Sequence, residues 1–141
     1  MAKNILAVLL LTSFFYSCSS SKKTASSTSF SLYDKKAVAC YYADKFNGRK
    51  TANGETFSNN KYTAAHKKLP FGTKVKVTNK ANGKWVIVTI NDRGPFTRGR
   101  DIDLAKKAFM DITDNKNNGT LHVTLEIAKI KRPAKSGTFS L

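Results

Sequence analysis

The stretch VTINDRGPFTRGRDIDL, residues 88–104, joins an apolar strand to a short polar turn. The apolar run covers residues 85–90, and Asn91 and Asp92 follow it directly, before Arg-Gly-Pro-Phe at 93–96. Because proline fixes one backbone angle and glycine reaches conformations closed to other residues, this turn favours one defined geometry. The stretch holds three of the nine acidic residues in a chain with 25 Lys and Arg. We therefore predict that Asp92 has a fixed position, either as a catalytic acid or as a cap of the turn.

The segments around this stretch alternate between apolar and polar residues, which indicates β-strands. The strand at 85–90 is apolar on both faces, and Asn82-Gly83 before it predicts a hairpin turn. Helical spacing occurs only at 102–112, where Asp101 and Asp103 stand at the expected helix start and are assigned to N-capping. Short strands, glycine-rich turns and one short helix predict an all-β fold, a closed barrel more than an open sheet. The expected strands lie at 37–42, 74–78, 85–90 and 121–127, and the helical stripe comprises Ile102, Ala105, Phe109 and Ile112.

The N-terminus has the pattern of an exported lipoprotein. Lys3 precedes an apolar run at 5–16 that is too short to cross a bilayer comfortably, so residues 1–17 are predicted to be a signal peptide. Ser17-Cys18 ends the run and resembles a bacterial lipobox, which predicts a lipidated Cys18 and a membrane-anchored protein of the bacterial cell envelope that faces the periplasm. The alternative is an ordinary signal peptide with an incidental cysteine. We expect a Ser-rich tether at 18–36, a folded domain at 37–132 and a short tail at 133–141.

Cysteine and histidine are too few and too scattered for a metal centre. The chain has two of each, whereas a structural zinc site takes about four ligands, so no metal and no cofactor is predicted. If Cys18 is acylated, Cys40 has no partner for an internal disulfide. Since Cys40 lies in an apolar strand, we predict that it is buried and structural rather than a nucleophile.

The mature chain is strongly basic. Removing residues 1–17 takes away Lys3 and no acid, which leaves 24 basic and 9 acidic side chains, a net charge of +15. Such a charge attracts polyanions. For an exported protein these are membrane head groups and cell wall carboxylates, so nucleic acid is not the predicted partner, and no RNP-type motif is present. The alternative is a basic surface that serves solubility alone.

A series of short motifs follows in order between residues 37 and 130. They are ACYY at 39–42, FNGR at 46–49, TANGETF at 51–57, TAAH at 63–66, LPFG at 69–72, VKVTN at 75–79, NDRGPF at 91–96 and IDL at 102–104. In this combination the chain resembles the rare lipoprotein A (RlpA-like) family of bacterial lytic transglycosylases. The resemblance implies a six-stranded double-psi β-barrel that acts on the glycan strands of peptidoglycan, and we expect a monomer.

The resemblance also implies a reaction and a set of site residues. Lytic transglycosylases cleave the MurNAc–GlcNAc bond without water, because the sugar's own 6-hydroxyl closes on C1 and leaves a 1,6-anhydro-MurNAc end. By motif, the catalytic acid falls on Asp92, with Glu55 and His66 as the other active-site positions. The implied substrate contacts are Tyr42, Asn91, Arg93 and Phe96.

Plainer roles stay open for these residues. Glu55 follows Asn-Gly and could be a solvated hairpin residue, while a lone His66 is often structural. If the nearby aromatic residues Trp85 and Phe96 buried Asp92 in part, its pKa would rise. Many family members carry a sporulation-related repeat domain, for which residues 133–141 are too short. The alternative function is a non-catalytic, peptidoglycan-binding or expansin-like wall-loosening lipoprotein.

Overall fold

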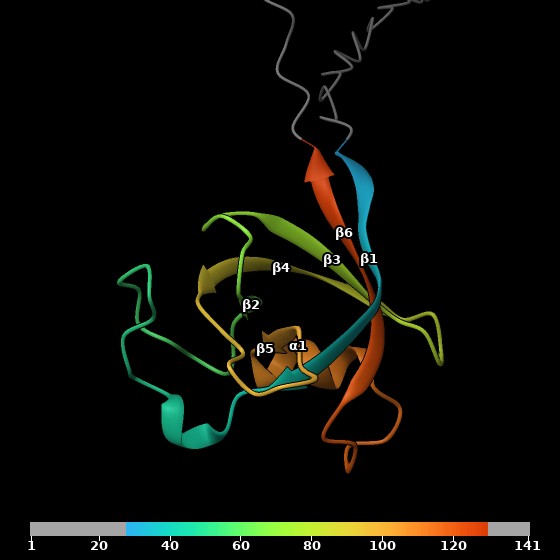
Figure 1. The fold of residues 1–141 in the computed structure, drawn as a ribbon. Coiled ribbons are helices and arrows are strands. Elements are labelled where there is room, and N and C mark those ends of the chain that lie inside the picture. Colours follow the sequence, from blue (N-terminus) through green and yellow to red (C-terminus); the bar gives the residue numbers. More distant parts are fainter. Residues whose placement is uncertain (1–27, 130–141) are drawn as a thin grey trace, which may run out of the picture.

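The computed structural model describes residues 28–129, and these form a closed barrel of six strands (Figure 1). The order around the barrel is β1-β5-β2-β4-β3-β6; β1 runs parallel to β5 and β2 parallel to β4, while the other neighbours are antiparallel. The predicted all-β fold with a six-stranded barrel is confirmed. The strands are β1 (Ser29–Tyr41), β2 (Thr63–His66), β3 (Lys74–Asn79), β4 (Trp85–Asp92), β5 (Ile102–Leu104) and β6 (Leu121–Lys129), with the 3-10 helix η1 (Asp44–Phe46) and the helix α1 (Lys106–Ile112).

The expected signal peptide, Cys18, most of the expected tether and the tail lie outside the described residues, so those expectations stay predictions. Between residues 28 and 129, no helix combines the length and apolar character that crossing a membrane requires.

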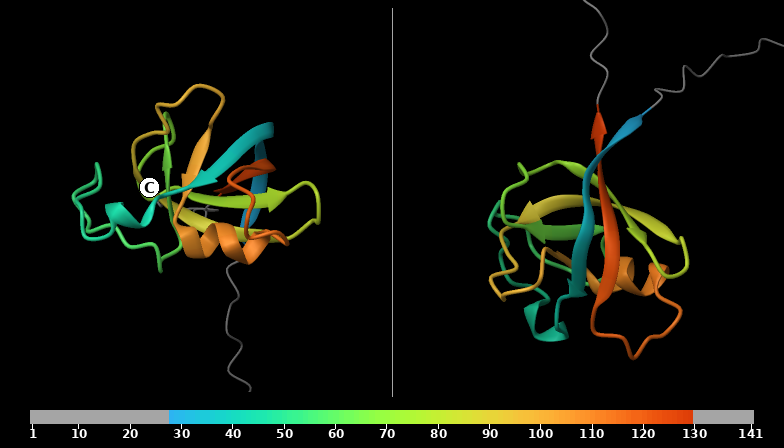
Figure 2. Two further views of the ribbon diagram at one scale, coloured as in Figure 1. Left: turned by 90° about the horizontal axis from the view of Figure 1, so that it is seen from below. Right: turned by 45° about the vertical axis from the view of Figure 1, so that its right-hand side comes forward.

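The first strand begins earlier than the sequence indicated. β1 starts at Ser29, eight residues before the expected domain start at residue 37. It pairs with β6 from Ser29, opposite Lys129, to Ala39, opposite Leu121, and the two strands extend together beyond the rest of the barrel (Figure 2). Main-chain hydrogen bonds to a neighbouring strand can order a segment that buries few side chains. The boundary at residue 37, drawn from Ser-rich composition, is therefore wrong.

The segment 102–112 divides into a strand and a helix, where the sequence predicted one helix. Ile102 and Leu104 are fully buried while Asp103 between them points outward, which is the period of a strand. β5 pairs with both β1 and β2, and α1 starts only at Lys106. All four apolar residues of the predicted stripe are buried, so their burial alone did not distinguish a strand from a helix.

Neither Asp101 nor Asp103 caps α1, in contrast to the prediction. The N-cap residue is Ala105, which has no capping side chain. Asn59, from the loop before β2, acts instead: its Oδ1 and its carbonyl oxygen accept the N–H groups of the first two helical residues at 3.0 and 2.9 Å. A residue distant in sequence thus satisfies donors that the helix leaves free at its start. The Asp101 carboxylate accepts the N–H of Val38 at 2.8 Å and ties β1 to the start of β5.

Burial in the strands follows their period of two. Cys40 is buried and unpaired, and burial raises the pKa of its thiol, in agreement with the predicted structural role. β4 buries only one face, although both of its faces are apolar in sequence. Its inward residues Val86, Val88 and Ile90 are buried, whereas Trp85 and Ile87 on the outward face are 57% and 38% exposed.

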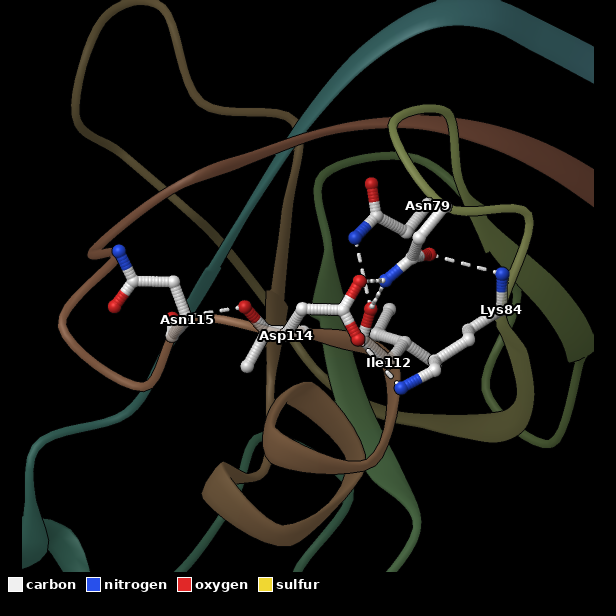
Figure 3. A network of polar contacts seen from close by, with 7 residues as sticks. Asn79, Lys84, Ile112, Asp114 and Asn115 are labelled. Atoms are coloured by element: carbon white, nitrogen blue, oxygen red, sulfur yellow. Dashed lines mark hydrogen bonds and ion pairs between the residues drawn. The ribbon is translucent and has the colours of Figure 1, made fainter.

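The hairpin between β3 and β4 is fastened to the C-terminal end of α1 (Figure 3). Asn79 and Asn82 donate from Nδ2 to the carbonyl oxygen of Ile112 at 2.8 and 3.1 Å. Carbonyl groups in the last turn of a helix have no partner within the helix, so these amides replace it. Asp114, just beyond the helix, accepts from Asn82 Nδ2 at 2.8 Å and from Lys84 Nζ at 2.5 Å.

We expect Asn79→Ala to lower the free energy of unfolding by about 1–3 kcal/mol, because it removes two hydrogen bonds from a buried site, although Asn82 still donates to the carbonyl oxygen of Ile112. Asn79 is 3% exposed, and its side chain also accepts the N–H of Ala81 at 3.0 Å. Urea denaturation measures the change. Asn60→Ala is the matched control, since Asn60 is exposed, and its effect should stay within about 0.5 kcal/mol. Equal losses in the two variants would contradict the role of Asn79.

Candidate active site

A groove of about 380 Å³ opens on the outside of the barrel, where β1 and β4 end. A second hollow of about 370 Å³ adjoins it, and the two share Tyr42, Phe46 and Asp103. The two hollows therefore adjoin along one shared wall and extend the groove. Its lining combines aromatic side chains (Tyr42, Phe46, Phe57, Phe96), basic side chains (Arg49, Lys50, Arg93) and two carboxyl groups (Asp92, Asp103).

Three donors fix the carboxyl group of Asp92, the last residue of β4. Oδ1 accepts the N–H groups of Ala52 and Arg93 at 2.9 and 2.8 Å, and Oδ2 accepts the hydroxyl of Tyr42 at 2.7 Å. The bond to Arg93 is the predicted cap of the turn, and the same carboxyl group lines the groove. The capping role is therefore present in the structure, and the catalytic role of Asp92 stays a prediction.

The turn after β4 gives this carboxyl group an open setting. Gly94 has a φ of +133°, in a region that side chains with a Cβ rarely adopt, so glycine is required there. Phe96 is 87% exposed, and Trp85 stands at the opposite end of β4. Trp85 is therefore too far along the strand to cover Asp92, and Phe96 is itself mostly exposed.

Glu55 reaches the same strand end through Asn91. The buried Asn91 donates from Nδ2 to Glu55 Oε2 at 2.9 Å, and its carbonyl oxygen accepts the N–H of Asn53 at 3.2 Å. The hydrogen bond from Asn91, aided by Asn53, holds the pKa of Glu55 below its usual range, so Glu55 is a carboxylate at neutral pH. The structure thus brings Glu55 and Asp92 to one end of β4, with Glu55 exposed beside the groove rather than in its lining.

Tyr42 connects the Asp92 carboxylate to the aromatic part of the lining. Its ring lies 4.4 Å from that of Phe57 and 5.7 Å from that of Phe46. Burial, together with the hydrogen bond to Asp92 and the charge of that carboxylate, raises the pKa of Tyr42 well above its usual value. The hydroxyl therefore stays protonated and donates a hydrogen bond to Asp92.

The guanidinium of Arg93 donates to main-chain carbonyl oxygens, among them that of Asp92 at 3.5 Å. Nη1 donates to the carbonyl oxygens of Leu69 and His66 at 2.9 and 3.3 Å, and the guanidinium lies 3.8 Å from the centre of the Phe71 ring. These contacts tie the turn after β4 to the loop after β2. Arg93 also lines the groove, so it supports the turn and adds positive charge to the lining.

The ring of His66 does not line the groove. It borders a separate recess with Tyr33, whose ring lies 5.5 Å away, and its Nδ1 accepts the N–H groups of Lys68 and Leu69 at 3.1 and 3.0 Å. Burial lowers the pKa of His66, which favours the neutral ring that these bonds require. The contacts fit the structural alternative for His66, and its catalytic role stays a prediction.

Asp103 is a groove residue that the sequence analysis assigned to helix capping. Its side chain is 14% exposed, and Arg100 Nη2 donates to its Oδ1 at 2.5 Å. Burial raises the pKa of Asp103, and the charge of Asp92 adds to this, against the lowering effect of Arg100. The sequence did hold a signal, because Ile-Asp-Leu at 102–104 alternates as a strand does and so turns the acid outward.

A family model described as lytic transglycolase matches residues 26–125, which includes the whole groove and the start of β1. The chain belongs to this family. The matched range runs from the start of β1 into β6 and begins before Ser29, in agreement with the early start of β1.

Proteins named endolytic peptidoglycan transglycosylase RlpA are similar to this member of the family. The protein from Pasteurella multocida is 45% identical over 115 residues, which cover 82% of this chain and 39% of the relative. Those named probable RlpA from Treponema pallidum and a Synechocystis strain are 54% and 53% identical over 64% and 67% of this chain, and over 28% and 29% of their own length. The RlpA-like resemblance is confirmed, and the chain spans less than half the length of these relatives.

Among solved structures, the Streptomyces papain inhibitor has a similar fold. Its TM-score is 0.51 at 21% identity, over 66% of this chain and 91% of that chain. At this identity the likeness concerns the barrel fold alone.

Proposed function

We propose that this protein is a lytic transglycosylase that cleaves the MurNAc–GlcNAc bond of peptidoglycan glycan strands during cell wall remodelling. The observation that carries the proposal is the fixed carboxyl group of Asp92 in an open groove, with a second carboxyl group, Asp103, in the same lining. Glycosidic bond cleavage relies on such carboxyl groups flanking the scissile bond. Membership of the lytic transglycolase family and the names of the relatives support the same reaction.

In this reaction the 6-hydroxyl of MurNAc attacks C1, and the hydroxyl proton must be accepted. The carboxyl group of Asp92 accepts donors at both oxygens and faces the groove, so it is suited to accept this proton too. The sequence-based prediction made Asp92 the acid, whereas these contacts suit it to the role of base. Glu55, a carboxylate at the edge of the site, stabilises the positive charge that develops on the sugar.

The groove lining suits a long, anionic sugar chain. Phe96, 87% exposed at the edge, offers an apolar ring face to a pyranose, and Arg49 and Lys50 place positive charge beside it. Carboxylates of the lactyl groups and stem peptides are the anions that such charges attract in the cell wall.

Incubation of the purified protein with isolated sacculi tests the function. The soluble products, analysed by mass, should end in 1,6-anhydro-MurNAc, one water lighter than hydrolysed ends. Reducing ends in their place would identify a hydrolase. Binding to sacculi without release, where a known lytic enzyme releases products, would identify the alternative: a peptidoglycan-binding or expansin-like module.

We also propose that the protein is anchored through Cys18 in the bacterial cell envelope, faces the periplasm and acts as a monomer. The expected result is that a fatty-acid analogue labels the wild type and not Cys18→Ser, because acylation needs the thiol. Several acyl chains hold a protein firmly, so the variant should move to the soluble fraction. Cys40→Ala, which removes the other cysteine, should keep the label. Equal labelling of wild type and Cys18→Ser would contradict the anchor.

A further inference from the structure

Asp103 lies where the two hollows of the groove meet. One hollow contains Asp92 and Phe96, and the other contains Lys45 and Arg100, while Asp103 borders both. A polymer that extends from one hollow into the next must therefore pass this carboxyl group. An endolytic enzyme needs such a passage, since its substrate continues on both sides of the bond that breaks.

The barrel register places Asp103 and Asp92 on the same outward face. Asp103 on β5 is opposite Ala65 on β2, and Ala65 is in turn opposite Asp92 on β4. The backbones that carry the two carboxyl groups are thus two strand spacings apart, about 10 Å. Paired carboxyl groups of glycosidases lie about 5–9.5 Å apart. Because only the small Ala65 lies between the two strands, the side chains of Asp92 and Asp103 can reach this separation by inclining toward each other.

The two carboxyl groups differ in their surroundings. Asp92 accepts three hydrogen bonds, two from the backbone and one from Tyr42. Among the described residues, Asp103 has one donor, Arg100, and its side chain is largely withdrawn from solvent. Burial and the charge of Asp92 raise the pKa of Asp103, against the lowering effect of Arg100, so Asp103 keeps its proton to higher pH than an ordinary aspartate does.

We infer that Asp103 is the proton donor of the proposed reaction and that Asp92 is its proton acceptor. This inference rests on the proposed function and adds a catalytic residue to it. Asp103 transfers its proton to O4 of the departing GlcNAc as the C1–O4 bond breaks. The 6-hydroxyl of MurNAc forms the new bond to C1 and releases its proton to Asp92. Exchange with solvent then returns a proton to Asp103 and removes one from Asp92, so no water is consumed.

The test compares two leaving groups. Asp103→Asn should cleave glycan strands about 10²–10⁴-fold more slowly than the wild type. On a muramyl oligosaccharide that carries 4-nitrophenol at its reducing end, the same variant should stay within about tenfold of the wild type, because nitrophenolate departs without protonation. Asp92→Asn should lose activity on both substrates. Asp111→Asn is the matched control, since Asp111 accepts a hydrogen bond from the Tyr62 hydroxyl at 2.7 Å and lies outside the groove lining; both activities should be unchanged.

The pH dependence of activity gives a second readout, which a purely structural role of Asp103 would not change. The reacting form of Asp103 is protonated, so wild-type activity should fall as pH rises through its pKa, and Asp103→Asn should lose this alkaline limb. Arg100→Gln removes the cation that lowers the pKa of Asp103, and should move the limb to higher pH.

The outcomes separate the two proposals. Wild-type rates on glycan for a folded Asp103→Asn variant, or equal losses on both substrates, would overturn the proton-donor role while the transglycosylase remains. A wild-type protein that cleaves neither substrate would overturn both.

Discussion

Asp92→Asn should slow the release of anhydro products from sacculi by about 10²–10⁴-fold while the protein stays folded. The amide oxygen of Asn can still accept the N–H groups of Ala52 and Arg93, and the hydroxyl of Tyr42 can accept from the new amide group. The substitution therefore keeps the geometry of the turn and removes the group that exchanges a proton. Product release over time, followed by mass, measures the effect.

Two comparisons make this result specific. Asp111→Asn repeats the change in another tyrosine–aspartate contact, Tyr62 to Asp111 at 2.7 Å on α1, and should leave the rate unaltered. Binding of Asp92→Asn to sacculi should match the wild type, because the basic and aromatic lining is untouched. A folded Asp92→Asn variant with wild-type rates would remove Asp92 from the chemistry.

Phe109→Ala should lower the free energy of unfolding by about 3–5 kcal/mol. Phe109 is fully buried on α1, and its ring centre lies 4.8 Å from that of Tyr41 on β1. Removing the ring leaves a cavity between the helix and the barrel that the surrounding strands cannot fill by shifting. For a domain of this size each kcal/mol shifts the melting temperature by roughly 4–8 °C, so thermal and chemical denaturation should both detect the loss.

Phe96→Ala provides the matched comparison, since the same side chain is lost from a position that is 87% exposed. Its effect on unfolding should stay within about 0.5 kcal/mol. Binding to sacculi should weaken, because the ring lies at the edge of the groove. A destabilisation of Phe109→Ala no larger than that of Phe96→Ala would show that α1 contributes little to the core.

The local pattern of the sequence determined most of the barrel. Alternation predicted the strands at 74–78 and 121–127, and apolar runs predicted those at 37–42 and 85–90; each has a counterpart in the structure. The position of Asp92 at a strand end, before a turn that needs glycine, was also visible in sequence. These features depend on residues within a few positions of one another, so the sequence alone is sufficient to predict them.

Tertiary structure alone decided the remaining features. Ser29 belongs to β1 because β6 supplies its backbone partner, and Ile102–Leu104 is a strand because β1 and β2 flank it. The same pairing turns Asp103 into the groove instead of leaving it to cap α1. In each case the deciding contacts come from segments distant in sequence. Periodicity within one segment shows which side chains share a face, but the neighbouring strand that forms beside it determines whether that face meets the core, the solvent or the groove.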